Sequence, residues 1–188
     1  MKIPNVSFHY LLTIALLWGL TQPLGAQTIY VTGTNDDQEG MEIEKQIQFY
    51  LDYYQIYQSL IVIVDLKPGV RMPSFEQYKY RAFLVPTVID KQDAFQIFID
   101  RDLSSRQRSI VLAHEMVHLR QYVSGDLAQP DPNTFCWKGK PYPQVQSIAY
   151  HYREWEQEAF QEQYILYKRY RQSYSQPEQP LGCLSDKP

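Results

Sequence analysis

The chain has 188 residues, which is enough for one domain with a hydrophobic core and too few for two domains of ordinary size. Its formal net charge is −3, with acidic and basic residues mixed along the chain, so the basic surface typical of nucleic-acid-binding proteins is not expected. We therefore expect one domain, at residues 27–175, between an N-terminal export signal and a C-terminal tail.

Residues 1–26 are typical of a secretory signal peptide. Lys2 gives a positive start, an apolar run extends from Tyr10 to Leu20, and small residues end at Ala26, which predicts cleavage before Gln27. The apolar run is shorter than the roughly 20 residues that a membrane-spanning helix needs. We expect a secreted or periplasmic protein with no membrane span after signal cleavage, and an uncleaved N-terminal anchor is the alternative.

Export affects how the only two cysteines, Cys136 and Cys183, are interpreted. An oxidising compartment allows two cysteines to form a disulfide, which would tie the tail to a loop of the domain. Closing a loop of that length would contribute about 4 kcal/mol in the chain-entropy model. Two unpaired thiols are the alternative, and no Cys-x-x-Cys spacing of a zinc site is present.

The first half of the domain alternates strand and helix patterns. A polar turn region, Gly33–Gly40, is followed by a predicted helix, Met41–Tyr54, whose apolar residues recur at helical spacing. The predicted strands are Thr28–Thr32, Ser59–Leu66, Tyr80–Ile89 (interrupted by Pro86) and Phe95–Asp100. Because strands precede the main helices, the order predicts an α+β domain with a small mixed sheet.

A helix is predicted between Ser104 and Gly125. Ser104 and Gln107 form a capping-box pattern, and Gly125 is placed to end the helix. Two apolar stripes run along it, one through Leu112, Met116, Leu119 and Val123, the other through Ile110, Ala113 and Val117. A loop, Asp126–Ser147, a helix, Tyr152–Ser173, and an irregular proline-rich tail, residues 176–188, are predicted to follow.

The first of these helices contains His114-Glu115-Met116-Val117-His118, an H-E-x-x-H sequence. On a helix, two imidazoles four residues apart point the same way, so both can bind one zinc ion, with Glu115 beside them as a general base. The alternative is a pair of core histidines that only form hydrogen bonds.

A catalytic zinc needs a third protein ligand and an open position for water. The extended motif H-E-x-x-H-x-x-G-x-x-H is absent, because Gln121 and Ser124 occupy its glycine and third-histidine positions. A glutamate on the last helix is the other common solution, and the sequence offers three candidates there.

Helical phasing separates these three glutamates. Glu156 falls in the middle of an apolar arc, whereas Glu154 and Glu158 fall on the polar side. A buried carboxylate needs a partner, for which a metal ion suffices, and a buried Glu–Arg or Glu–Tyr pair is the alternative. We therefore predict one Zn²⁺ per chain, bound by His114, His118 and Glu156.

His114-Glu115-x-x-His118 followed by Glu156-x-x-Ala159 resembles the gluzincin clan of zinc metallopeptidases, which includes thermolysin-like enzymes. The resemblance implies a zincin-like minimal metallopeptidase domain, in which a small mixed sheet packs on the H-E-x-x-H helix and the C-terminal ligand helix.

The resemblance extends roughly from Phe95 to Tyr170, and the stretch from Trp137 through Ala159 also resembles small, poorly characterised bacterial zincin-like proteins. One position departs from the thermolysin-like pattern. Those enzymes carry an aspartate one turn after the ligand glutamate to orient a histidine, and this chain has Phe160 there. Another group must then support the imidazoles.

By this resemblance the protein is expected to be an exported zinc metallopeptidase that acts on a peptide or protein, with an extended substrate lying along Phe95–Asp100 as the edge strand. Tyr150, His151 and Tyr152 are the candidate donors to the oxyanion. The alternative function is a zinc-binding but non-catalytic secreted recognition protein. The 16 tyrosines suit such a surface, but the favoured interpretation is that they lie at the amphipathic edges of the core. The oligomeric state is left open.

Overall fold

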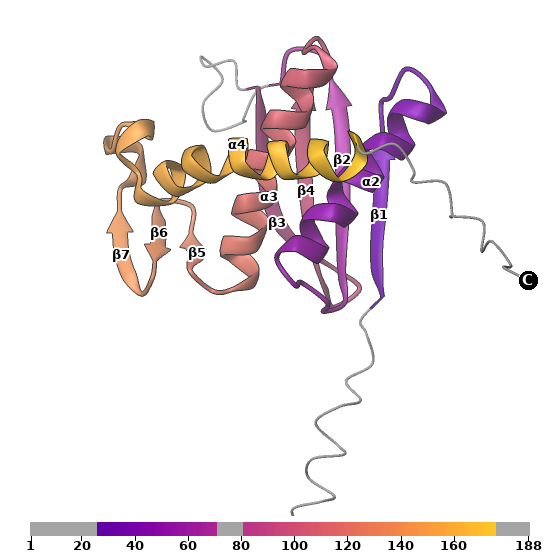
Figure 1. Ribbon diagram of the computed structural model, residues 1–188. Coiled ribbons are helices and arrows are strands. Elements are labelled where there is room, and N and C mark those ends of the chain that lie inside the picture. The colour runs from indigo at the N-terminus through magenta and orange to yellow at the C-terminus, as the bar shows by residue number, and fades with distance from the viewer. Residues whose placement is uncertain (1–25, 71–80, 176–188) are drawn as a thin grey trace, which may run out of the picture.

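The computed structural model describes residues 26–70 and 81–175 (Figure 1). The predicted signal peptide, apart from its last residue, and the predicted tail lie outside the described residues. Cys183 does too, so its pairing with Cys136 stays a prediction. Cys136 itself is half-buried. In the described parts of the chain, no helix is long and apolar enough to cross a membrane.

A four-stranded mixed sheet forms the base of the domain. Its strands are β1 (Gln27–Thr32), β2 (Leu60–Lys67), β3 (Ala82–Ile89) and β4 (Gln92–Asp100), in the order β1-β2-β4-β3. Strands β1, β2 and β4 are parallel, and β3 pairs antiparallel with β4. Every second residue of β2 is buried, which matches the alternation expected of a strand with one face on the core.

The inner position of β4 corrects one prediction. Phe95–Asp100 is not an edge, because β4 forms hydrogen bonds with β2 on one side and β3 on the other. The edge strands are β1 and β3. Pro86 was a signal for the edge position of β3, since proline cannot donate to a strand ladder and is confined to edges and bulges.

Three helices complete the main α+β unit: α2 (Asp37–Tyr53), α3 (Ser105–Val123) and α4 (Glu154–Ser175). The predicted α+β class is therefore confirmed. Helix α2 begins within the segment predicted to be a polar turn, because the Asp36 side chain accepts a hydrogen bond from the Glu39 N–H and caps the helix there.

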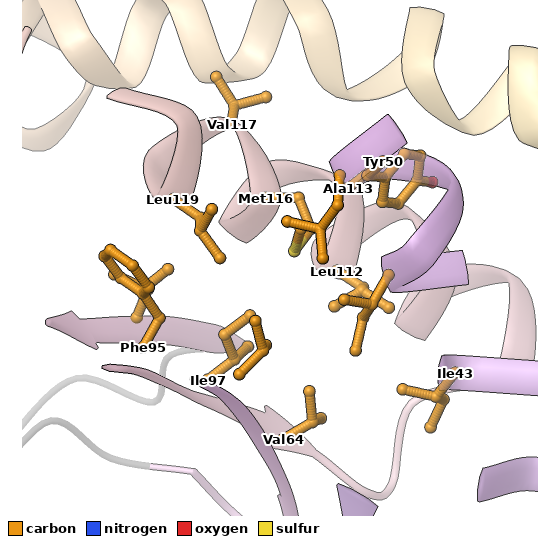
Figure 2. Packing of buried hydrophobic residues seen from close by; sticks show 14 of the residues in the cluster. Ile43, Tyr50, Val64, Phe95, Ile97, Leu112, Ala113, Met116, Val117 and Leu119 are labelled. Atoms are coloured by element: carbon orange, nitrogen blue, oxygen red, sulfur yellow. The ribbon is translucent and has the colours of Figure 1, made fainter. Parts of the chain in front are cut away.

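Helix α3 lies between the sheet and α4, so the domain has three layers (Figure 1). Its first apolar stripe packs on the sheet, and Figure 2 shows Leu112, Met116 and Leu119 facing Ile97 of β4. Val117 of the second stripe points toward α4. The two stripes predicted for this helix therefore serve two interfaces. The predicted capping box at Ser104 is also present.

The predicted loop Asp126–Ser147 is wrong for most of its length, because it contains a second, antiparallel sheet. Its strands are β5 (Leu127–Asp131), β6 (Thr134–Trp137) and β7 (Lys140–Pro143). Lys138 and Gly139 turn between β6 and β7 with φ of 47° and 79°, as a two-residue hairpin requires. Trp155, at the start of α4, packs on this sheet, and its ring stacks on Phe135 with centroids 5.4 Å apart.

The end of β1 depends on one glycine. Gly33 has φ of +74°, and a Cβ atom there would lie 2.2 Å from the Leu66 carbonyl oxygen of β2. Gly69 has a similar φ of +61° with nothing within 4 Å of such an atom. At both positions the positive φ is unfavourable for a residue with a side chain. Only at Gly33 would the Cβ atom also clash with the main chain of Leu66.

We expect Gly33→Ala to lower the free energy of unfolding by about 1–3 kcal/mol more than Gly69→Ala does, because the clash adds to the shared backbone strain. Denaturant unfolding of the two variants beside the unmodified protein measures the difference. Equal losses of unfolding free energy in the two variants would mean that the chain at Gly33 moves away from Leu66 without a cost in stability.

Candidate metal centre

Three side chains from two helices converge at one point between α3 and α4. The Nε2 atoms of His114 and His118 are 3.2 Å apart, and Glu156 Oε2 lies 3.3 Å from the first and 3.2 Å from the second. Their exposed fractions are 6%, 8% and 6%. Within residues 26–70 and 81–175, this is the one group of three or more potential ligands whose atoms are close enough to hold a metal ion.

The position of Glu156 follows from the residues around it. Trp155 and Ala159 are buried, so α4 is fixed in rotation with Glu156 turned toward α3. Glu154 is exposed, and Glu158 pairs with Arg120 at the border of the interface. The prediction that Glu156 is the buried acid of the three is therefore confirmed. Its ion-pair partners are the two histidines rather than an arginine.

The electrostatics of the cluster favour a positive charge at its centre. Burial alone would raise the pKa of Glu156, but the two imidazoles hold it well below its usual range. Burial alone would lower the pKa of His118, but Glu156 outweighs it and raises the pKa to about 9. No lysine or arginine of the described residues pairs with Glu156 or with the neighbouring, equally buried Glu115. A divalent cation can take the place of the His118 proton, and the donor set it then meets is two neutral nitrogens and a carboxylate.

Glu115 lies beside the cluster without belonging to it. With His118 and Glu156 it lines a cleft of about 270 Å³, whose opposite wall is edge strand β3 from Ala82 to Pro86. Burial raises the pKa of Glu115, and the two histidines oppose the rise. A carboxylate here is placed to exchange a proton with a molecule in the cleft.

Gln121 supports one of the imidazoles, a role that the sequence analysis missed. Its Oε1 lies 2.8 Å from His118 Nδ1, while its Nε2 donates to the Trp155 carbonyl at 3.1 Å and to Glu158 at 2.8 Å. Because the amide oxygen accepts, His118 Nδ1 carries the proton and Nε2 presents its lone pair to the cluster. One turn after His118, Gln121 supplies the support that the sequence analysis required for an imidazole.

His114 has different surroundings. Its Nδ1 is buried and has no hydrogen-bond partner among the described residues. The ring of Phe160 packs against the imidazole with centroids 4.8 Å apart, although Phe160 is 46% exposed. Phe160 therefore positions His114 by contact and leaves its tautomer free.

Of the three residues proposed as oxyanion donors, Tyr150 is the one that reaches the cluster. Its hydroxyl lies 3.4 Å from His114 Nε2, and its side chain lines the cleft. His151 and Tyr152 are exposed and do not line the cleft. Burial and the nearby Glu156 raise the pKa of Tyr150 well above its usual value, so its hydroxyl remains a neutral donor.

Comparison of the chain with protein-family models, with curated proteins and with solved structures found no significant match.

Gln121 and Gln46 form a matched pair for testing the support of His118. Both are buried, with exposed fractions of 0% and 1%, and both donate to a backbone carbonyl of a neighbouring helix. We expect Gln121→Ala to weaken Zn²⁺ binding about 10- to 100-fold, as loss of such a partner typically does. Competition with a chromogenic chelator measures the affinity.

Gln46→Ala is the control, because it removes a similar set of hydrogen bonds far from the cluster. Both variants should unfold at lower denaturant concentration, but only Gln121→Ala should bind the metal more weakly. Similar metal affinities in the two variants would show that Gln121 contributes packing alone.

Proposed function

We propose that the protein is an exported zinc-dependent metallopeptidase with a gluzincin-like site and a zincin-like fold. The observation that carries the proposal is the near-equal spacing of the three ligand atoms, 3.2–3.3 Å. Ligands about 2.0–2.1 Å from a tetrahedral zinc are about 3.3 Å from one another, so the set fits three corners of a zinc site and leaves the fourth open.

A bound zinc ion would polarise the substrate carbonyl and lower the pKa of a water molecule to about 7. Glu115 faces the same cleft, where it takes the proton of the attacking water and later returns it to the leaving nitrogen. Tyr150 donates its hydroxyl to the oxygen on which negative charge develops.

A peptide is the proposed substrate because one wall of the cleft is a strand edge. The N-terminal half of β3 offers its main chain beside Glu115 and His118, and an extended peptide can pair with such an edge. Pro86 has no N–H, so this pairing ends near it. The resemblance of the motif to gluzincins supports the same substrate class.

A zinc-binding recognition protein without turnover is the second candidate. Several tyrosines expose about half of their surface or more, as recognition surfaces often do; these are Tyr30, Tyr57, Tyr152, Tyr164 and Tyr174. A buried glutamate that is not a ligand argues against it, since structural zinc needs no general base.

Glu115→Gln tests the peptidase directly. We expect one zinc per chain in both the mature protein and the variant, and at least a 100-fold lower turnover of a mixed peptide library by the variant, since the amide cannot accept the proton. Metal analysis and mass spectrometry of the library measure the two quantities, with and without a chelator.

Glu154→Gln is the matched control. It makes the same chemical change at an exposed glutamate at the start of α4, so turnover should be retained. Stoichiometric zinc without cleavage in the unmodified protein would favour the recognition protein. Absence of zinc would exclude both candidates.

Tyr150→Phe tests the oxyanion donor. We expect kcat to fall about 100- to 1000-fold with KM and zinc content little changed, because the hydroxyl acts mainly on the transition state. Tyr152→Phe, at a side chain that is 68% exposed, should leave kcat unaltered. A fall in zinc content instead would assign Tyr150 to the support of His114.

A further inference from the structure

Arg153 is the one arginine or lysine among the described residues that line the cleft beside the candidate metal centre. Its Nε donates to the Ile148 carbonyl at 3.2 Å and its Nη2 to the Val145 carbonyl at 3.3 Å. The guanidinium also lies over the ring of Tyr150, with its carbon 5.5 Å from the ring centroid. All three partners are uncharged, so they hold the guanidinium in place without neutralising it.

No aspartate or glutamate of residues 26–70 or 81–175 forms an ion pair with Arg153. Arg120 shows the contrast, because three carboxylates surround its guanidinium in the same half of the molecule. A fixed, uncompensated guanidinium in a partly dry cleft attracts an anion. Its Nη1 and one N–H of Nη2 remain available, and a carboxylate matches this planar arrangement.

The cleft therefore contains two chemically different groups. Glu115, His118 and Glu156 line it with carboxylates and an imidazole, and Arg153 lines it with a cation. Tyr150 connects them, since its hydroxyl approaches His114 while its ring lies against the guanidinium. The Tyr150 side chain thus separates an anion bound at Arg153 from the candidate metal ligands. This separation corresponds to about two to three residues of extended chain.

We propose that Arg153 binds the free C-terminal carboxylate of a peptide, so that the enzyme cleaves within about three residues of the C-terminus. This rests on the proposed peptidase function. The volume of the cleft, about 270 Å³, suits a short C-terminal segment better than a long internal one. A C-terminal carboxylate is an anion that every unmodified peptide carries, whatever its sequence.

Three versions of one peptide library separate the sources of the anion: one with a free C-terminal acid, one with a C-terminal amide, and one amidated with a glutamate near the end. For the unmodified protein we expect kcat/KM for the free acids to exceed that for the amides about 10- to 100-fold, the usual effect of a charge-assisted hydrogen bond. Cleavage should fall within three residues of the C-terminus.

Arg153→Gln should bring the ratio of acid to amide close to one, whereas Arg153→Lys should retain part of the preference because it keeps the charge. Arg106→Gln makes the same change in net charge at an exposed position of α3 and should keep the full ratio. The zinc content of each variant is measured in parallel, so that loss of the metal is not mistaken for loss of the anion site.

Binding without turnover gives an independent measurement. In Glu115→Gln, calorimetric titration with an N-acetylated tripeptide should show tighter binding of the acid than of the amide, and adding Arg153→Gln should remove the difference. If Arg153→Gln does not fold, the same titration of Glu115→Gln with Arg153→Lys replaces it, and a reduced difference is the expected result.

Equal cleavage of acids and amides by the unmodified protein would overturn the carboxylate site alone and leave the peptidase standing. A preference for the amidated peptides with glutamate would show that Arg153 binds an acidic side chain, which also overturns it. No cleavage of any library despite bound zinc would overturn the peptidase function and the carboxylate site together.

Discussion

Helix α3 is enclosed on two sides, by the sheet and by α4, and the other features of the site depend on this enclosure. It buries four polar side chains of one helix, two of which, Glu115 and His118, also line the cleft: His114, Glu115, His118 and Gln121. Such groups need partners within the protein or a bound ion. Their common requirement explains why the next helix presents a carboxylate and a main-chain carbonyl at the same place.

Two kinds of contact hold α4 against this polar strip. Glu156 approaches the imidazoles, and one residue earlier the Trp155 carbonyl accepts from Gln121. Glu158, two residues beyond Glu156, accepts hydrogen bonds from Gln121 and Arg120. Because the ligand and the supporting contacts belong to the same turn of α4, the packing of the two helices and the geometry of the metal centre are set together. Loss of either would weaken the other.

The sequence contained much of this arrangement in its periodicity. Two apolar stripes were read on the helix that became α3, and the structure covers it on two sides. Helical phasing selected Glu156 because its neighbours Trp155 and Ala159 are apolar. Periodicity reports which side of a helix is buried, but it carries no information about which strand lies at an edge. Phe95–Asp100 was placed at an edge by the resemblance to gluzincins, and the strand order differs.

Other features depend on contacts that local patterns do not encode. The second sheet was missed because its strands are short, β5 and β7 contain proline, and β6 and β7 are joined by a lysine–glycine turn rather than by the asparagine–glycine pair usual in hairpins. Gln121 gave no signal, since its role arises only where α4 supplies the Trp155 carbonyl. Tyr150 was one of three candidates that the sequence could not separate. Only the short helical turn Tyr150–Tyr152 before α4 places its hydroxyl beside His114.

Trp155 joins the small sheet to the candidate metal centre. Its ring belongs to the small core under β5, β6 and β7, and the next residue is Glu156 of the candidate metal centre. One wall of the cleft is therefore rigid with the main sheet, and the other is attached to a ligand. A change in the width of the cleft would displace the Glu156 carboxylate, so the opening of the cleft is mechanically linked to the geometry of the candidate metal centre.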